Sequence, residues 1–91
     1  MEEITNLISK RDKTQSEFDA IYDKLQKIGL KLKEKEKMLL HAPEAGSLQE
    51  DVQNLRAEYD ETKKELDKAH LHHSLATIAL DDAQRKQSVA A

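Results

Sequence analysis

The chain has 91 residues, of which 36% are charged, 37% hydrophobic and only 3% aromatic, a composition too lean in apolar side chains for a thick globular core. A formal net charge of −3 argues against nucleic acid as a partner, and the absence of cysteine excludes disulfides and thiolate chemistry. Such charge combined with regular apolar spacing is typical of long helices and coiled coils rather than of a disordered chain.

The first predicted helix covers residues 2–41 and carries an unbroken seven-residue repeat. In a coiled coil, apolar side chains recur at the a and d positions of such a repeat and pack against a second helix. Acidic residues open this segment and lysines close it, which complements the helix macrodipole. Gly29 is a local weakness that costs about 1 kcal/mol relative to Ala in a helix interior. The expected seam residues are Ile4, Leu7, Arg11, Thr14, Phe18, Ile21, Leu25, Ile28, Leu32, Lys35 and Leu39.

A turn is predicted over residues 42–47. Pro43 lacks a backbone N–H and keeps the preceding residue out of the helical region, so the first helix should end near residue 41. Gly46 can adopt a positive φ, as tight chain reversals often require. Ser47 and Glu50 match a capping box, in which each residue bonds the backbone N–H of the other, so the second helix is expected to begin at residue 48.

The second predicted helix covers residues 48–86 and resumes the repeat. Folding it back on the first helix gives one register in which every a position faces a d position. In that register Phe18, Arg11 and Ile4 each face an alanine, and large-against-small alternation lets two helices approach closely. The sequence therefore predicts an all-α fold, a two-helix antiparallel coiled-coil hairpin that forms one domain over residues 1–91. Its rival is a long helix, broken at the proline, that dimerises. The expected seam residues of the second helix are Leu48, Val52, Leu55, Tyr59, Thr62, Leu66, Ala69, His73, Ala76, Leu80, Ala83 and Gln87.

Several residues outside the seam are candidate contact residues for a partner. Leu71, Leu75 and Ile78 form a second apolar stripe on the outer face of the second helix, and Tyr22 flanks the seam of the first. A thin hairpin cannot bury them alone, and exposed apolar stripes mark contact surfaces. Two readings are open: homodimerisation into a four-helix bundle, or binding of another protein. The lysine-rich end of the first helix, with Lys31 and Lys35, is either a basic contact patch or a solvated face.

Three polar residues interrupt the apolar repeat at seam positions. Arg11, Thr14 and His73 form a polar layer that fixes register or serves as a functional site. His70 and His73 lie one helical turn apart, but a structural zinc site needs about four ligands, so no metal is expected. The chain lacks a glycine-rich phosphate loop and a readable pairing of nucleophile and base. We therefore expect neither a cofactor nor enzymatic activity.

The sequence contains no apolar run near the roughly 18 residues that a membrane-spanning helix needs, and its first residues are acidic where a signal peptide would be basic. We therefore expect no membrane insertion and a cytoplasmic location.

The turn and the start of the second helix resemble the homology-region-1 (HR1) domains of Rho-family GTPase effectors. The matching residues are Gly46, Ser47, Leu48 and Gln49, followed by the repeat from Leu55 to Leu66. The resemblance implies an antiparallel hairpin that binds a small GTPase through faces near the turn, in an adaptor or effector protein. The proline-containing turn between two helices is also similar to that of viral nucleocapsid hairpins and secretion-needle subunits, which implies a self-assembling structural subunit as the alternative.

Overall fold

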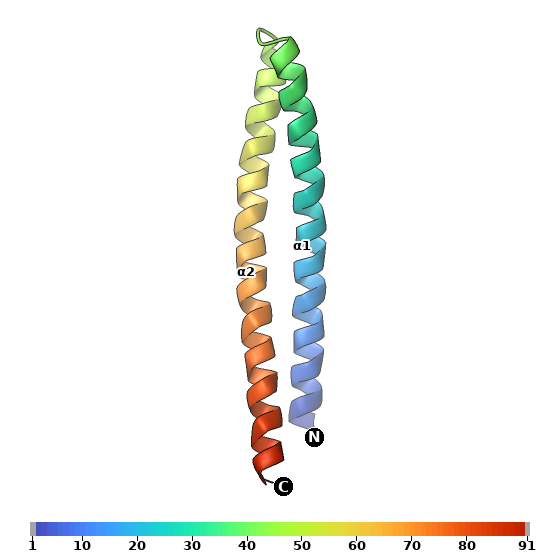
Figure 1. Cartoon of the computed structure of the whole chain (residues 1–91), viewed down its shortest axis with the longest axis vertical. Coiled ribbons are helices and arrows are strands. Elements are labelled where there is room, and N and C mark those ends of the chain that lie inside the picture. The colour runs from blue at the N-terminus through green and yellow to red at the C-terminus, as the bar shows by residue number, and fades with distance from the viewer. Residues whose placement is uncertain (1, 91) are drawn as a thin grey trace.

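The protein is a helical hairpin. The computed structural model describes residues 2–90, and their side chains from residue 3 to residue 88. Helix α1 spans Glu2–His41 and helix α2 spans Gly46–Ala90. The helices lie side by side and antiparallel, with the two chain ends at one end of the molecule and the turn at the other (Figure 1). With extents of 70 × 14 × 13 Å, the molecule confirms the predicted all-α hairpin.

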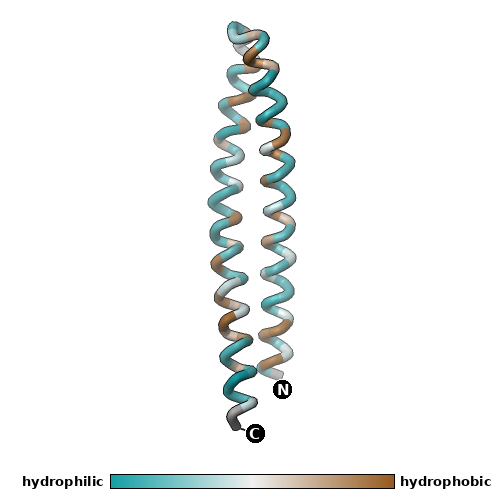
Figure 2. The backbone as a smooth tube through the Cα atoms, in the orientation of Figure 1, coloured by the Kyte–Doolittle hydropathy of each residue, from teal (hydrophilic) through white to brown (hydrophobic). Residues whose placement is uncertain are grey.

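The core of the protein is the seam between α1 and α2. Hydrophobic positions recur along both helices with hydrophilic positions between them (Figure 2), as the seven-residue repeat requires. Every buried residue in the described part of the chain occupies a predicted seam position, so the heptad register is correct. The buried residues are Thr14, Leu25, Ile28, Val52, Thr62, Ala69, Ala76 and Leu80.

Polar contacts between the helices show how they are aligned. Near the open end, Thr14 Oγ1 lies 3.2 Å from His73 Nδ1, and these two residues are a predicted seam pair. Toward the turn, Lys35 Nζ lies 3.4 Å from an oxygen of Asp51, and Arg56 lies 3.6 Å from an oxygen of Glu36. Lys35 of α1 thus pairs with an acidic residue of α2, and Glu36 of α1 pairs with a basic residue of α2, so charge supports the same alignment as the apolar repeat.

The turn is a β-turn with Pro43 and Glu44 at its centre. The N–H of Ala45 donates to the carbonyl of Ala42 over 3.1 Å and closes the turn. Proline suits the first central position because its ring presets φ near −65°. The side chain of Gln49 also braces the turn, since Nε2 donates to the carbonyl of Pro43 over 2.7 Å. The chain has thus reversed direction before residue 46.

Helix α2 begins earlier than the capping-box pattern predicts. The carbonyl of Ala45 accepts hydrogen bonds from the N–H groups of Leu48 and Gln49, both over 3.1 Å, so Ala45 is the N-cap and Ser47 lies inside the first turn. The expected use of Gly46 is also wrong, because no glycine in the described residues has a positive φ. The four-residue β-turn completes the reversal without a left-handed residue. At its other end α2 continues to Ala90, four residues beyond the predicted limit.

The hairpin exposes more surface than a compact protein of its mass. Its accessible surface is 7092 Å², whereas a compact monomer of 10.4 kDa exposes about 5,400 Å². Two helices bury only the stripe that each presents to the other, and the remaining faces of both helices stay open. Any function must therefore be sought on these outer faces or along the edges of the seam.

Candidate interaction surface

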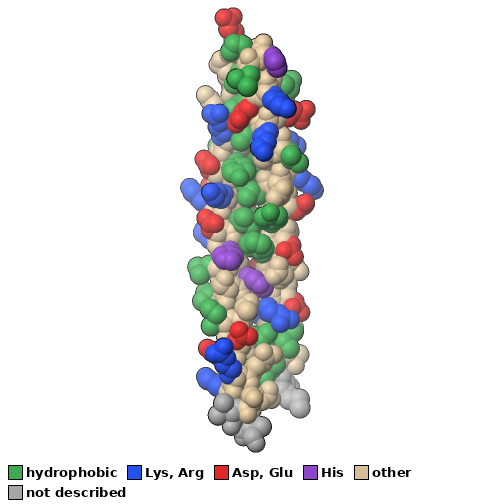
Figure 3. All heavy atoms as spheres, in the orientation of Figure 1, with side chains coloured by type: hydrophobic (Ala, Val, Ile, Leu, Met, Phe, Trp, Pro, Cys, Tyr) green, Lys and Arg blue, Asp and Glu red, His purple; other side chains and the backbone are tan. Residues whose placement is uncertain are grey.

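The predicted apolar stripe lies on the outer face of α2. Leu71, Leu75 and Ile78 are 56%, 55% and 56% exposed, although they are large aliphatic side chains. They occupy the f and c positions of the heptad, which point away from the seam. Hydrophobic side chains are visible along the outer edge of the lower half of α2, beside histidines (Figure 3). We call these three residues the outer stripe.

The outer stripe lies within a stretch of α2 that contains no fixed charge. Residues 69–80 include no Asp, Glu, Lys or Arg, in a chain that is 36% charged. Twelve residues make about three turns of helix, so the uncharged band extends all the way around α2. A helix without a charged face is normally covered on several sides, whereas α1 covers only one side here. This break in the charge pattern is the sequence signal that marks the band, beyond the three apolar residues themselves.

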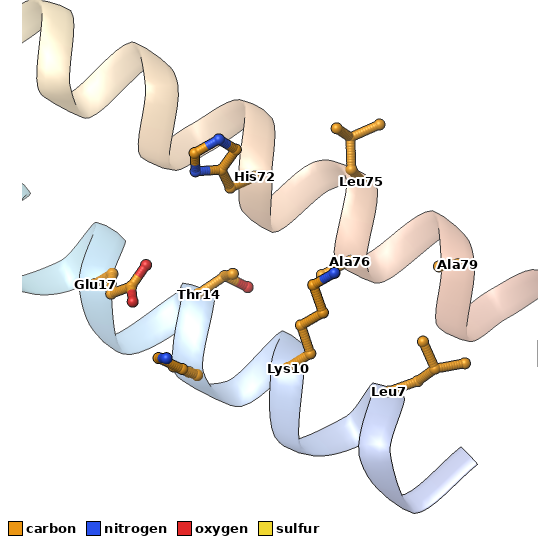
Figure 4. A pocket seen from close by; sticks show the side chains of 9 residues that line it. Leu7, Lys10, Thr14, Glu17, His72, Leu75, Ala76 and Ala79 are labelled. Atoms are coloured by element: carbon orange, nitrogen blue, oxygen red, sulfur yellow. The ribbon is translucent and has the colours of Figure 1, made fainter. Parts of the chain in front are cut away.

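A groove runs beside the outer stripe along one edge of the seam. It is a depression of about 590 Å³ that is lined by apolar, polar and charged side chains of both helices. Small alanine side chains on α2 leave this space, while Lys10 reaches across from α1 and Leu75 projects away from α1 (Figure 4). A second depression of about 520 Å³ continues the groove toward the open end of the hairpin. The first depression is lined by Leu7, Lys10, Lys13, Thr14, Glu17, His72, Leu75, Ala76 and Ala79.

The predicted polar layer forms a hydrogen-bonded pair inside the seam. Thr14 is 7% exposed, and its hydroxyl donates to the carbonyl of Arg11 over 2.9 Å. A hydroxyl has one proton, so His73 Nδ1 must be the donor in its 3.2 Å contact with Thr14. This network assigns the proton of a neutral His73 to Nδ1. The guanidinium of Arg11 pairs with the neighbouring Asp12 of α1 at 3.0 Å.

The three neighbouring histidines occupy three different environments. His70 packs against the ring of Phe18, with 5.8 Å between ring centroids. His72 lines the groove, and His73 bonds to Thr14. Among the described residues there is no group of three or more His, Asp or Glu side chains placed to hold a metal ion.

The remaining predicted contact residues lie apart from the outer stripe. Tyr22 is 48% exposed on α1 and stacks on Phe18, with 6.2 Å between ring centroids. Lys31 and Lys35 lie closer to the turn, at a shallow depression of about 340 Å³, where Lys35 pairs with Asp51. The structure therefore does not bring the six predicted contact residues into one site. It separates them into the outer stripe, an aromatic pair and a charged edge.

A further apolar group near the turn escaped the sequence analysis. Leu30, Met38 and Leu40 of α1 are 67%, 46% and 80% exposed. They fall at f, g and b positions, which already place them outside the seam. They do not follow one another at the spacing of three and four residues that marks the outer stripe, so the sequence pattern alone does not single them out as a contact face.

Neither described helix contains a stretch that is long and apolar enough to cross a lipid bilayer.

A scan of protein-family models, a search of curated proteins and a search of solved structures found no match to this chain.

Proposed function

We propose that the protein is a non-enzymatic coiled-coil interaction module whose contact face is the outer stripe and the uncharged band around it. The observation that carries the proposal is the exposure of Leu71, Leu75 and Ile78, each more than half accessible, within twelve residues that contain no fixed charge. Removing a large aliphatic side chain from water is favourable by about 1.5–3 kcal/mol, so three half-exposed side chains leave a substantial part of this free energy unused in the hairpin alone. A partner that covers the band gains this free energy on binding.

The hairpin serves as a rigid support for this face. Helix α1 packs along α2 at the level of the outer stripe, so the stripe lies on a helix that is already formed and its backbone need not be ordered on binding. The groove beside the stripe widens the face toward α1 and adds polar and charged side chains, which protein interfaces usually combine with apolar ones. The absence of cysteine in the chain agrees with a cytoplasmic, reducing environment.

A second candidate face lies near the turn, where Leu30 and Leu40 are exposed next to the lysine-rich end of α1. The resemblance to HR1 domains favours this region as the site for a small GTPase, in an adaptor or effector role. The remaining alternative is a self-assembling structural subunit, in which either face contacts another copy of the chain.

Photo-crosslinking from single positions distinguishes these faces. A photoreactive phenylalanine analogue is placed at Leu75, or at Leu40 as the matched exposed-leucine control, and the chain is irradiated in its native cells. The proposal predicts a discrete crosslinked product from position 75. A product from position 40 alone would transfer the contact face to the turn, as the GTPase resemblance implies. Absence of any product from position 75 would contradict the proposal.

A further inference from the structure

The outer face of α2 carries a second heptad seam that is wider than the outer stripe. On each side of the stripe, charged residues continue the alternating spacing of three and four residues. Each residue advances the helix by about 100°, so this seam points about 160° away from the one that faces α1. All of its members are exposed. They are Glu61, Lys64, Lys68, Leu71, Leu75, Ile78, Asp82 and Arg85.

We infer that the occupant of this second seam is α2 of a second copy of the chain, packed antiparallel about a two-fold axis at the level of His73. This inference rests on the proposed function, because it takes the outer stripe to be the contact face. In the inferred register, Leu71 faces Leu75 of the second copy, and the two-fold axis repeats the pair. The four leucines form the apolar centre, and Ile78 packs on the aliphatic stem of Lys68 of the second copy.

Charge complementarity selects this occupant. In the inferred register, Lys64 faces Asp82 of the second copy and Glu61 faces Arg85 of the second copy. The two-fold axis doubles both pairs, so four pairs of opposite charge flank the apolar centre. Long-range attraction of this kind fixes partner and register in coiled coils. A sequence that is complementary to itself when reversed indicates a second copy rather than a foreign helix.

Other arrangements of two α2 helices are less favourable. A parallel pair in register would place each charged residue opposite itself, for example Asp82 opposite Asp82. The next antiparallel register, with Leu75 facing Ile78, would place Lys68 opposite Arg85 and Leu71 opposite Asp82. Both would set like charges together, which destabilises helix pairs. Only the inferred register keeps the apolar residues together and the flanking charges opposed.

The edges of this interface are unequal. On one edge, Glu58 faces Lys86 of the second copy, and His72 lies near the two-fold axis. On the other edge, Asp67 faces Asp81 of the second copy, which is the one unfavourable charge pair. The inference therefore assigns opposite roles to two adjacent aspartates: Asp82 holds the copies together, and Asp81 weakens them.

The second seam also determines the shape of the dimer. Because it lies almost opposite α1, the four helices form a flat row, with the two α2 helices at the centre, rather than a compact four-helix bundle. The two-fold axis lies closer to the open end than to the turn, so the turns project in opposite directions. At 1.5 Å per residue the dimer is about 85 Å long, compared with 70 Å for one hairpin.

Charge reversal tests the inferred register. Asp82→Lys and Lys64→Glu should each raise the dissociation constant of the dimer by about tenfold at low ionic strength, because each turns two attractive pairs into repulsive ones. The double variant exchanges the charges and should restore association to within about threefold of the original chain. Sedimentation equilibrium gives the constants, and circular dichroism checks that each variant remains helical.

The adjacent substitution Asp81→Lys is the matched control, because it changes the net charge equally but removes the repulsion with Asp67. It should tighten the dimer where Asp82→Lys weakens it. Equal effects of the two substitutions, or a double variant that stays monomeric, would overturn the register. A chain that remains monomeric while position 75 still crosslinks to a foreign protein would overturn the second copy but keep the proposed function. If position 75 crosslinks to nothing, both fail.

Discussion

At the scale of single residues, the Thr14–His73 pair shows how a polar group is accommodated in a thin seam. Thr14 is buried, and its hydroxyl is used twice, as donor to the carbonyl of Arg11 and as acceptor from His73. The buried hydroxyl needs these hydrogen-bond partners, because a buried polar group without a hydrogen bond destabilises the fold by more than the bond itself contributes. The pair also occurs at only one level of the seam, so it opposes a shift of one helix along the other.

Replacing Thr14 by Val should lower the free energy of unfolding by about 1–2 kcal/mol, because the isosteric methyl group leaves His73 Nδ1 without its acceptor. Thr14→Ser keeps the hydroxyl and should lose less. The double variant Thr14→Val with His73→Leu removes both polar groups and should recover most of the loss. Urea unfolding followed by circular dichroism measures these differences, and additive losses in the double variant would contradict a direct bond between the two residues.

At the scale of the helices, the seven-residue repeat determines most of the structure. Its spacing places Leu25, Ile28 and Leu80 in the seam without knowledge of any contact, because only one face of each helix can meet the other. The same pattern predicted the pairing of Thr14 with His73. The alanines alone do not fix the register, because a shift by one heptad would still place Ala69 and Ala76 opposite the bulky Leu25 and Phe18. The short turn and the Thr14–His73 contact are what tie the helices to the observed register.

The helix ends and the contact face were harder to predict. Ser47 is intrinsically the better N-cap by about 1 kcal/mol, but the β-turn around Pro43 completes the reversal before it and makes Ala45 the N-cap. The pairing of the Arg11 guanidinium with Asp12 is a side-chain contact that the heptad spacing alone does not encode. The sequence identified the outer stripe, but the separation of Tyr22 and Lys35 from it is a property of the folded hairpin.

Gly29 is the place where α1 can be strengthened. A Cβ atom added there would lie 3.5 Å from Cε2 of Tyr59, an ordinary van der Waals contact. Gly29→Ala should therefore stabilise the hairpin by up to about 1 kcal/mol and raise Tm by about 4–8 °C. Gly46→Ala, at the first residue of α2, should have a smaller effect of the same sign. Thermal unfolding by circular dichroism measures both, and a lower Tm for Gly29→Ala would show that Tyr59 cannot accommodate the methyl group.

At the scale of the whole molecule, the balance of free energies determines how tightly two hairpins associate. Burying the exposed halves of three aliphatic side chains on each copy contributes about 5 kcal/mol. Loss of translational and rotational freedom opposes association by at least about 4 kcal/mol. The apolar centre alone is therefore nearly balanced, and the flanking charge pairs decide the affinity. Salt should weaken the dimer, because these charges are exposed and screened.

Sedimentation equilibrium of the unmodified chain over a wide concentration range is the most direct test of the contact face. We predict a reversible change from 10.4 kDa to twice that mass as concentration rises. The variant with Leu71, Leu75 and Ile78 all replaced by Lys should remain a helical monomer throughout. A single 10.4 kDa species of the unmodified chain at every concentration would contradict self-association, and loss of helicity in the variant would show that the outer stripe belongs to the core.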